Sequence, residues 1–566
     1  MQILLSLQTG RGASDEATND RERVAQALAN IRPAVAHPIT IHAGPGLAIG
    51  MFGPEAPNAG YEVAGGLDET SGLSIRLPGL ELRVQADSIR AQSDAIGSRT
   101  LWFCCDGDRV LLSTSQRALI ACLGSFRLAQ EAVGWFMVSG CAGPSMSWDA
   151  RIRALAPGAT LTVSKQQGVP DVVIRKPSFE TIALRSEQRE RRLLEAIRFA
   201  THDLPRGPEV ALSLSGGLDS RVLLSLIPER RSLRCFSWGP PDALNVAGTD
   251  AFVARQVAER LGAPFHFVPL LPVAIESVID EYVAASEARV DHLGGYVDGM
   301  ALWRALVAEH GVKLMLRGDE AFGWVPVLTE SDVRRSVGAP ELRDFGNRSW
   351  LLRAGLGDLA LPALPPQLLR QRRESLATWR DRLYQQYRAP SILAALSAIK
   401  ASYVETLNPF THERVLAEVR RLPDRDRTDK RLFRRLAREH FDPTHVPFAT
   451  AESGPGFSPS RVAELALLEL HSKEAEECLS APLRHRLLEA AHQASARTES
   501  ATNQAHRRRL VDPARLPLLA RRILRNTILQ EPLGVNKLLL RAVLMSRAIR
   551  LFRADASALA AGPAAS

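Results

Sequence analysis

The chain has 566 residues, enough for about two to four domains of roughly 100–200 residues each. Its 45% hydrophobic and 23% charged residues lie close to the average for globular proteins, which excludes a disordered or fibrous chain. The 71 Lys and Arg residues outnumber the 62 Asp and Glu residues and give a net charge of +9. This charge suits anionic ligands such as nucleotides and pyrophosphate, and it admits nucleic acid without requiring it.

The cysteines and the start of the chain bear on the cellular compartment. No cysteine belongs to a Cys-x-x-Cys pair or has histidines at the spacing of zinc ligands, so neither a disulfide framework nor a structural metal is expected. The first apolar run is too short for a signal peptide, and no segment approaches the roughly 18 uncharged apolar residues of a membrane span. We therefore expect a cytoplasmic protein with no membrane partner. The cysteines are Cys104, Cys105, Cys122, Cys141, Cys235 and Cys478.

Over the first 165 residues or so, short apolar runs alternate with turn signals, a pattern typical of β-hairpins. In one example, the runs Leu101–Cys105 and Val110–Ser113 flank an Asp-Gly turn. On a strand Cys104 and Cys105 point to opposite faces, and we expect both in the core rather than in catalysis. Polar residues, Gly and Pro then break the pattern, so we place the first domain at residues 1–175.

The rest of the sequence has a different pattern. After a helical run from about residue 180 to 202, short apolar runs alternate with helical stretches from Glu209 onward, which predicts a parallel sheet wrapped by helices. Beyond Trp350 the chain is mostly helical. The sequence therefore predicts an α/β protein, in which an α+β sandwich domain precedes a parallel-sheet domain over residues 176–566 that is helical after about residue 350.

Near the C-terminus, apolar residues recur at helical spacing with arginines between them. From Leu518 to Arg553 this pattern predicts an amphipathic pair of helices packed on the protein with a solvated basic face. A docking face for an acidic partner is the alternative. The last residues, Ala556–Ser566, have no periodicity and are expected to fray.

The most informative segment is a strand-like run that ends abruptly in two glycines before a helix. The run ends at Leu214 and continues as Ser215-Gly216-Gly217-Leu218-Asp219-Ser220. The glycines let the backbone approach a phosphate, and the helix start directs unpaired N–H groups and its positive dipole end toward the anion. The serine hydroxyls add donors, and Asp219 is a candidate ligand for the Mg²⁺ that a pyrophosphate group requires. An ordinary strand-turn-helix connection is the alternative.

This segment resembles the pyrophosphate-binding loop of the ATP-pyrophosphatase enzymes, and further segments resemble their asparagine synthetase branch. The resemblance implies an ATP site formed by Leu214, Ser215, Gly216, Gly217, Asp219, Ser220 and, at an adenine-contacting strand end, Trp238 in Phe236-Ser237-Trp238-Gly239. Other matches are Asp250 with His266, Leu316–Gly323 with Asp319 as the second Mg²⁺ ligand, Glu405, Asn408-Pro409-Phe410, and Lys430 as a pyrophosphate-contacting lysine.

The first domain resembles the family's glutaminase-type domain, through Ser115-x-Arg117-x-Leu119 and Leu155–Gly158. A working glutaminase of this kind uses an N-terminal Cys as nucleophile and its own α-amine as base. This sequence starts Met1-Gln2 and has no cysteine before Cys104. The resemblance thus implies a degenerate glutaminase-like domain that releases no ammonia from glutamine, so that another amine attacks the activated carboxylate.

Two departures narrow the resemblance further. Asparagine synthetases carry an acidic stretch ahead of the second Mg²⁺ ligand, and β-lactam synthetases a Tyr three residues before it, whereas this chain has Leu316 and Arg317 there. Lasso-peptide macrolactam synthetases resemble the chain in a short Arg-Gly-Asp-Glu form of this motif. They also share a late Arg-x-Asp-Lys, which Arg427-Thr428-Asp429-Lys430 matches.

By this resemblance, the protein is a cyclase that uses ATP and Mg²⁺ to adenylate an Asp or Glu side chain of a leader-free precursor peptide. The peptide's N-terminal amine then closes an isopeptide (macrolactam) bond. The implied partners are the precursor peptide and the leader peptidase and leader-binding protein of the same pathway. Asp219 and Asp319 would hold Mg²⁺, Lys430 would stabilise the leaving pyrophosphate, and Glu405 would orient or deprotonate the attacking amine. A solvated helix lysine and an exposed or cap-paired glutamate are the alternatives.

Other functions stay open at this point. A small-molecule amide or β-lactam synthetase of the same family is the main alternative, and it would need no peptide for ATP turnover. A tRNA-modifying enzyme also fits the loop, but the chain lacks the Cys pairs or aromatic stripe that would support nucleic acid as a partner. An inactive scaffold that presents a peptide is opposed by the presence of both candidate Mg²⁺ ligands and Lys430. Secondary candidates are Arg317 and Glu320, as an ion pair or substrate contacts, and Asp291-His292, as an ordinary loop pair or a wall of the peptide cavity.

Overall fold

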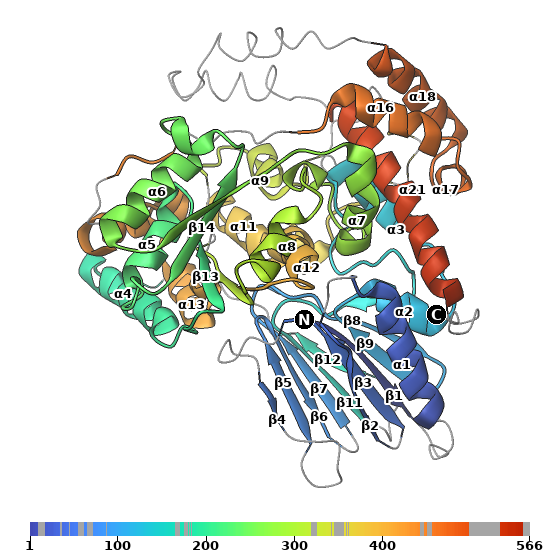
Figure 1. Cartoon of the computed structure of the whole chain (residues 1–566), viewed down its shortest axis with the longest axis horizontal. Helices are drawn as coiled ribbons and strands as arrows, with labels where there is room; N and C mark the ends of the chain where they lie inside the picture. Colours follow the sequence, from blue (N-terminus) through green and yellow to red (C-terminus); the bar gives the residue numbers. More distant parts are fainter. Residues whose placement is uncertain are drawn as a thin grey trace.

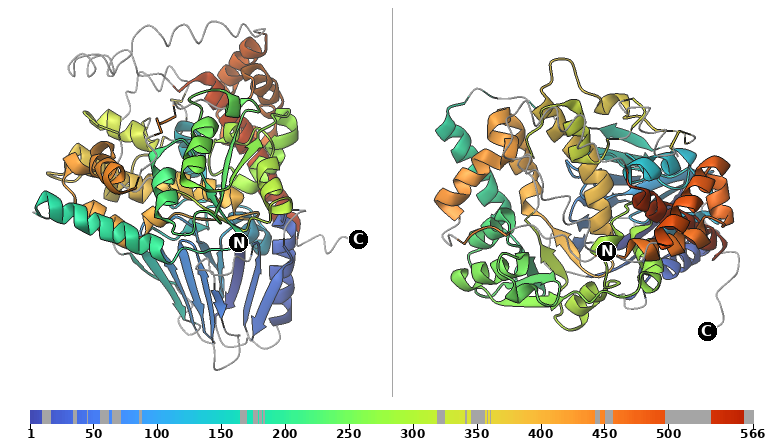
Figure 2. Two further views of the ribbon diagram at one scale, coloured as in Figure 1. Left: turned by 60° about the vertical axis from the view of Figure 1, so that its left-hand side comes forward. Right: turned by 90° about the horizontal axis from the view of Figure 1, so that it is seen from above.

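The protein combines a sandwich of two antiparallel sheets with a parallel sheet covered by helices (Figure 1). The predicted mixed α/β class is confirmed. In Figure 2, left, the antiparallel strands form the lower part of the molecule and the helix-covered sheet lies above them. The computed structural model describes the chain except for residues 10–16, 34–36, 45, 55–61, 65–71, 86–87, 165–169, 175–178, 180–181, 183, 319–324, 341, 345–355, 358, 360, 442–445, 450–455, 497–532 and 559–566.

Each sheet of the sandwich has six strands. The first, in the order β10-β8-β9-β1-β3-β2, contains β1 (Gln2–Gln8), β2 (Thr40–Gly44), β3 (Leu47–Phe52), β8 (Trp102–Asp106), β9 (Arg109–Ser113) and β10 (Arg153–Ala154). The second, in the order β12-β11-β7-β6-β5-β4, contains β4 (Glu62–Ala64), β5 (Leu73–Leu77), β6 (Leu80–Val84), β7 (Ser88–Ser93), β11 (Ala159–Ser164) and β12 (Asp171–Ile174). Aliphatic side chains from both sheets, among them Leu5 and Leu82, form one buried core between them.

The hairpin predicted around the Asp-Gly turn is confirmed. Asp106 of β8 pairs with Arg109 of β9, and Gly107 between them has a φ of 60°, a backbone angle that a two-residue hairpin turn requires. Cys104 is buried but Cys105 is exposed, because neighbouring residues of a strand point to opposite faces. The prediction that both cysteines lie in the core is therefore wrong for Cys105.

The parallel sheet has the strand order β15-β14-β13-β16-β17. The order reverses at β13, so the crevice between the carboxyl ends of β13 and β16 is the topological switch point at which open α/β sheets bind ligands. The short strand β17 lies in the region that the sequence predicted to be mostly helical. The strands are β13 (Val210–Ser213), β14 (Arg234–Gly239), β15 (Phe265–Pro269), β16 (Leu314–Leu316) and β17 (Glu405–Leu407).

Both faces of this sheet are buried, which is typical of parallel sheets. Leu212 and Leu316 face one hydrophobic cluster, whereas Ala211 and Met315 face another. Among the described helices, none is long and apolar enough to cross a membrane.

The helices are α1 (Ala17–Ile31), α2 (Gln116–Leu123), α3 (Gln130–Ser139), α4 (Ser186–His202), α5 (Leu218–Leu226), α6 (Asp250–Leu261), α7 (Ile275–Ser286), α8 (Ala301–Ala308), α9 (Glu330–Val337), α11 (Leu376–Leu383), α12 (Ala394–Lys400), α13 (Glu413–Arg421), α14 (Asp424–Arg427), α15 (Arg431–Leu436), α16 (Pro459–Glu469), α17 (Lys473–Cys478), α18 (Ala481–Ser495) and α21 (Val535–Ala558). Shorter helical turns are η1 (Ala243–Asn245), η2 (Leu293–Gly295), η3 (Pro366–Leu368), η5 (Pro409–Thr411) and η6 (Thr428–Lys430), and π-helical segments are η4 (Tyr384–Leu393) and η7 (Ala437–Phe441).

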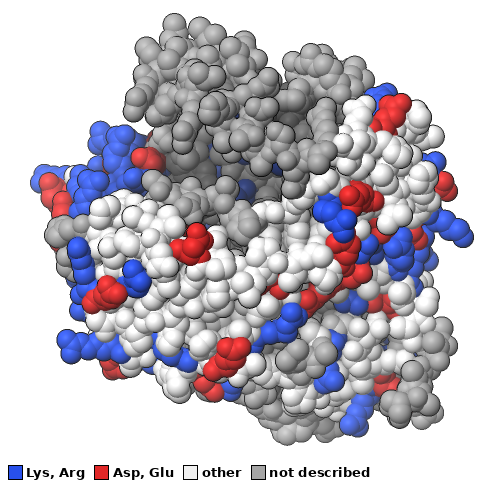
Figure 3. Space-filling model, turned by 45° about the horizontal axis from the view of Figure 1, so that its top comes forward, with Lys and Arg blue, Asp and Glu red and all other residues white. Residues whose placement is uncertain are grey.

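The C-terminal helix α21 joins the two halves of the molecule (Figure 1). Its Asp555 binds Arg117 of α2 at 2.8 Å, and its Arg541 binds Asp291, beyond α7, at 2.7 Å. Further arginines of α21 contact carboxylates of α7, α16 and α17, and Figure 3 shows red and blue side chains side by side on the right, where these helices lie. The predicted solvated basic face is therefore wrong for this helix. The first part of the predicted helical pair lies outside the described residues.

Candidate active site

The candidate pyrophosphate loop follows β13 and lies at the switch point of the parallel sheet. Leu214 is buried, and its N–H donates to the carbonyl of Phe236 in β14 at 2.8 Å, so the sheet fixes the start of the loop. Gly217 is the N-cap of α5, and Asp219 lies in the first turn of this helix. Negative charge is favourable at this end of a helix, where the unpaired N–H groups also accept an anion.

Ser215 and Ser220 form hydrogen bonds within the loop. Their hydroxyl oxygens lie 3.0 Å apart, and the N–H of Ser215 donates to the hydroxyl of Ser220 at 3.1 Å. The N–H of Gly217 donates to the hydroxyl of Ser215 at 3.2 Å. These bonds preform the turn, and an anion that binds there would exchange some of them for bonds to its oxygens. The pyrophosphate contacts of these residues stay a prediction.

Two polar contacts with residues outside the loop, which the loop sequence by itself did not reveal, also fix its position. Asp250, at the start of α6, accepts a hydrogen bond from the N–H of Gly216 at 3.0 Å. Arg221 is fully buried and donates to the carbonyl of Val446 at 2.6 Å, while its guanidinium lies 4.8 Å from the centre of the Phe448 ring. Asp250 follows the N-cap residue Thr249, a sequence pattern that predicts the start of a helix. The local sequence does not predict its contact with the loop, because the two segments lie far apart in the chain.

Gly318 brings the segment after β16 against the loop. A Cβ atom on Gly318 would lie 2.6 Å from the carbonyl carbon of Asp219 and 2.7 Å from the backbone nitrogen of Ser220. Only glycine fits this approach of two backbones. Asp319 and Glu320 follow directly but lie outside the described residues, so the role of Asp319 as the second Mg²⁺ ligand stays a prediction.

Lys430 reaches the loop from the helical part of the chain. Its ammonium group forms an ion pair with Asp219, and both side chains are largely buried, at 17% and 14% exposure. Asp429 and Lys430 have φ angles of 56° and 53°, so the chain makes a left-handed turn between α14 and α15 that directs the lysine inward. Lys430 is therefore not a solvated helix lysine, and the structure brings it together with the loop as the sequence analysis expected.

The residues around Asp219 fit a nucleotide with its magnesium ion. Mg²⁺ is usually bound through one or two carboxylates together with substrate phosphates. Asp219 supplies such a carboxylate beside an anion-binding helix start, and Lys430 supplies a fixed positive charge. Among the described residues, no three His, Cys, Asp or Glu side chains gather into a metal cage.

The family comparison agrees with this geometry. The asparagine synthase family model matches residues 204–522, more than half of the chain, and the match includes the loop, Gly318 and Lys430. The chain belongs to the asparagine synthase family. Enzymes of this family form amide bonds at the expense of ATP, typically with Mg²⁺, and the chain is an ATP-dependent ligase of this kind. A comparison with curated proteins found no match.

Trp238 is the candidate adenine contact of this asparagine synthase domain. It is the last residue but one of β14, so it borders the same carboxyl edge of the sheet as the loop. Its half-buried ring packs edge-on against Trp303 of α8, with the ring centres 5.7 Å apart. The adenine contact stays a prediction.

Glu405 faces the first domain rather than the loop. It is only 2% exposed, and its two carboxylate oxygens form ion pairs with Arg99 and with the α-amine of Met1, which also donates to the carbonyl of Ala401 at 2.7 Å. Burial raises the pKa of Glu405, but these positive charges outweigh burial and hold it below its ordinary value. Neither an exposed nor a cap-paired glutamate describes this position. Its action on the attacking amine stays a prediction, and the geometry favours a role in joining the domains.

Asp291 and His292 also belong to the joint between the domains of this asparagine synthase. Asp291 pairs with Arg541, and its carboxylate packs directly against the backbone of Gly140. Burial raises the pKa of Asp291, but contacts with His292 and Arg541 lower it by more, and the net pKa lies below its ordinary value. The alternative of an ordinary loop pair is the better description.

A cavity of about 750 Å³ lies between the sandwich and the parallel sheet, within the range of drug-sized ligand sites, roughly 300–1,000 Å³. Arg317 and Asn408, at the carboxyl ends of β16 and β17, line it together with Ser397 of α12. Arg317 directly precedes Gly318, so the cavity comes within one residue of the backbone contact with Asp219. No local sequence pattern predicts this cavity, because residues of both domains line it.

Proposed function

We propose that the protein is an ATP-dependent lasso-peptide cyclase, a ligase that joins the side-chain carboxyl of an Asp or Glu in a leader-free precursor peptide to the peptide's own N-terminal amine. The observation that carries this proposal is the ion pair of Lys430 with Asp219 at the pyrophosphate loop, combined with a first domain in which burial raises the pKa of the Cys104, Cys105 and Cys122 thiols. These observations support an adenylating site that works without the family's usual source of ammonia.

The cysteines support the second half of this argument. A glutaminase nucleophile must be a thiolate, whose formation a lowered pKa promotes. Burial instead raises the pKa of Cys122 to about 11 and that of Cys235 and Cys478 to about 12, and it also raises the pKa of Cys104 and Cys105. These five thiols therefore stay protonated at neutral pH. Their protonation supports an attacking amine other than ammonia from glutamine.

In the proposed reaction, the peptide carboxylate attacks the α-phosphorus of ATP, pyrophosphate leaves, and an acyl-adenylate forms. The N-terminal amine then attacks the acyl carbon, loses a proton, and displaces AMP. The loop around Gly216 and Gly217 would hold the phosphates, and Lys430 would stabilise the charge that develops on the leaving pyrophosphate. Mg²⁺, held by Asp219 and in our proposal also by Asp319, would neutralise charge on the same group.

The surroundings of β16 favour a peptide cyclase over a β-lactam synthetase. Leu316, which stands where the latter enzymes place a Tyr, is 1% exposed and packs in the core beside the sheet. No hydroxyl is therefore available there to act on a substrate amine. The interdomain cavity beside Arg317 offers room for an acyl acceptor larger than ammonia, and we propose the core peptide, delivered by its leader peptidase and leader-binding protein, as that acceptor.

The deciding experiment offers the protein a leader-free core peptide with a free N-terminus and an internal Asp or Glu, together with ATP and Mg²⁺. We expect a product lighter by one water, with AMP and pyrophosphate formed in equal amounts. Acetylation of the N-terminus should stop cyclisation, and replacement of the acceptor carboxyl by its amide should also stop AMP formation. A free amino acid that supports AMP formation, when no core peptide does, would overturn the cyclase proposal in favour of a small-molecule amide synthetase.

A further inference from the structure

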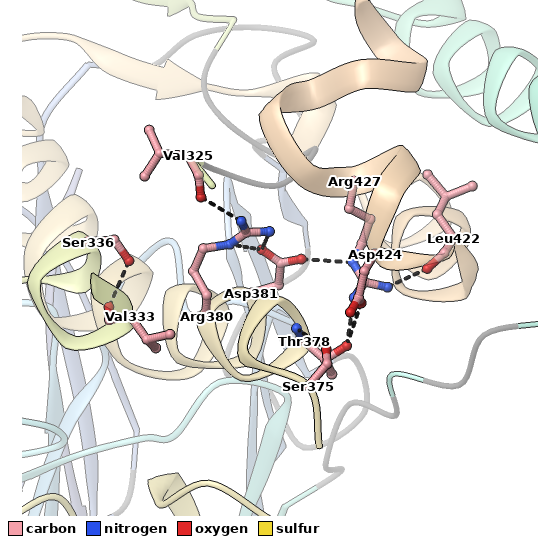
Figure 4. Close-up of polar contacts among 10 residues, drawn as sticks. All are labelled: Val325, Val333, Ser336, Ser375, Thr378, Arg380, Asp381, Leu422, Asp424 and Arg427. Atoms are coloured by element: carbon pink, nitrogen blue, oxygen red, sulfur yellow. Dashed lines mark hydrogen bonds and ion pairs between the residues drawn. The ribbon is translucent and has the colours of Figure 1, made fainter. Parts of the chain in front are cut away.

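A network of charged side chains joins α11 to α14 (Figure 4). The turn that carries Lys430 follows α14 directly in the chain. The centre of the network is Arg427, the last residue of α14, which is 1% exposed. The guanidinium donates to Asp381 at 2.8 Å, to Thr378 at 2.7 Å and to Asp424 at 2.6 Å, and also to the carbonyl of Leu422. Two nitrogens of this side chain, Nε and Nη2, thus connect α14 to α11.

The network continues along α11 through the second oxygen of Asp381. Arg380, which is fully buried, donates to this oxygen at 2.8 Å and to the carbonyl of Val325 at 2.6 Å (Figure 4). The carboxylate of Asp381 therefore bridges two guanidinium groups, and Asp424 supplies the fourth charge. Asp424 is 41% exposed, whereas Arg380, Asp381 and Arg427 are buried, and their pairing with opposite charges is a condition for keeping these three charges buried.

This network fixes Arg427, the residue that directly precedes the turn Thr428–Lys430. Thr428 and Asp429 separate Arg427 from Lys430, and the positive φ angles of Asp429 and Lys430 are unfavourable for residues with a Cβ atom. Such a turn persists only where its flanks hold it. Arg427 holds the flank before the turn, and the buried Leu432 and Phe433 of α15 hold the flank after it.

We propose that Arg427 and Asp381 are positioning residues, which hold the turn so that the ammonium group of Lys430 stays at the pyrophosphate loop. The inference rests on the role proposed for Lys430 in the ligase reaction. It also assigns a purpose to the arginine of the Arg-x-Asp-Lys sequence: this side chain contacts the scaffold and not the nucleotide. Loss of the network should let the turn relax and move the lysine away from Asp219.

The first test is the binding of magnesium pyrophosphate, which needs no peptide. We expect Arg427→Gln and Asp381→Asn to weaken this binding by about the same factor as Lys430→Ala, measured by calorimetry. The matched control is Arg382→Gln. Arg382 is also on α11 and buried, but it pairs with Glu374, away from the network. The control should lower the unfolding temperature and leave pyrophosphate binding unchanged.

The second test combines the variants. If Arg427 acts through Lys430, adding Arg427→Gln to Lys430→Ala should cause no further loss of binding or of kcat, although each change alone lowers kcat by roughly 10²-fold. Equal losses in the two backgrounds, or an Arg382→Gln variant as impaired as Arg427→Gln, would show a merely structural role and overturn the inference. A wild-type protein that binds pyrophosphate but cyclises no peptide would count against the cyclase proposal alone.

Discussion

Gly318 lies where two backbone segments of the candidate site approach each other closely. Its φ angle is not in the left-handed region, so the requirement for glycine is purely one of space. The peptide groups of Asp219 and Ser220 fill the position that a Cβ atom would take. Backbone atoms cannot rotate away as a long side chain can, and any larger residue must shift the loop.

Gly318→Ala should therefore impair the use of ATP. We expect kcat/KM for ATP to fall by roughly 10²-fold, because small displacements of positioning groups have effects of this size. The control is Gly294→Ala, where a Cβ atom would meet nothing within 4 Å. Both changes remove the same backbone freedom from the unfolded chain. An alanine variant at 318 with the ATP kinetics of the wild type would show that the contact between the two segments is not needed.

The predicted site residues also show what a local sequence can reveal. The loop from Ser215 to Ser220 is a contiguous signal, with a strand before it, glycines within it and a helix after it, and its placement was correct. The proximity of Lys430 followed only from a family resemblance. The contacts of Arg427, Arg221 and Glu405 join segments tens to hundreds of residues apart, and no spacing in the sequence encodes them.

At the scale of elements, local patterns predicted the β8–β9 hairpin, the helix α4 and the parallel sheet. They missed β17, since the three residues Glu405–Leu407 are too few to show a period. They misjudged α21, because its arginines look like a solvated face until the acidic residues of α7, α16 and α17 are placed beside them. The strand β17 and the paired arginines of α21 both depend on tertiary contacts, which a local sequence pattern does not contain.

The pairing of α21 makes a prediction about stability. Arg541→Gln leaves the carboxylate of Asp291 buried without its cation, a loss that typically costs about 3–5 kcal/mol. Arg553→Gln is the control, because Arg553 is 37% exposed and exposed pairs contribute at most about 1 kcal/mol. Urea unfolding of both variants should show this difference. Similar stabilities for the two variants would show that the Arg541–Asp291 ion pair of α21 does not stabilise the contact between the domains.

The same pair predicts a dependence on pH. The pKa of Asp291 lies below its ordinary value of 3.8 in the folded protein, so its stabilising contribution is fully present above that pH. The contribution is lost as the pH falls through the lower folded pKa. The difference in unfolding free energy between wild type and Arg541→Gln should therefore be constant at neutral pH and should shrink below about pH 3.8. A difference that grows on acidification would contradict the assignment of this ion pair.

At the scale of the whole molecule, one buried core continues from the helices of the first domain into those beside the parallel sheet. An ion pair adds a specific contact at this junction, between Arg99 of the first domain and Glu405 of β17. The pKa of Glu405 is held below its ordinary value of 4.5, so this ion pair stabilises the folded protein above that pH and weakens as the pH falls through the folded pKa. The first domain therefore supports the ligase domain through contacts that do not depend on glutaminase chemistry.

Glu405 allows a direct comparison between this structural role and the catalytic role that the family resemblance implied. If Glu405 joins the domains, Glu405→Gln and Arg99→Gln should each cost about 3–5 kcal/mol of stability, since each leaves an opposite charge buried without its partner. Both variants should keep near wild-type kcat well below their unfolding temperatures. If Glu405 acts instead on the attacking amine, Glu405→Gln should lower kcat by roughly 10²- to 10⁴-fold while Arg99→Gln does not. Thermal unfolding and single-turnover AMP release, measured on the two variants in parallel, separate the outcomes because Arg99 shares the ion pair but has no part in proton transfer.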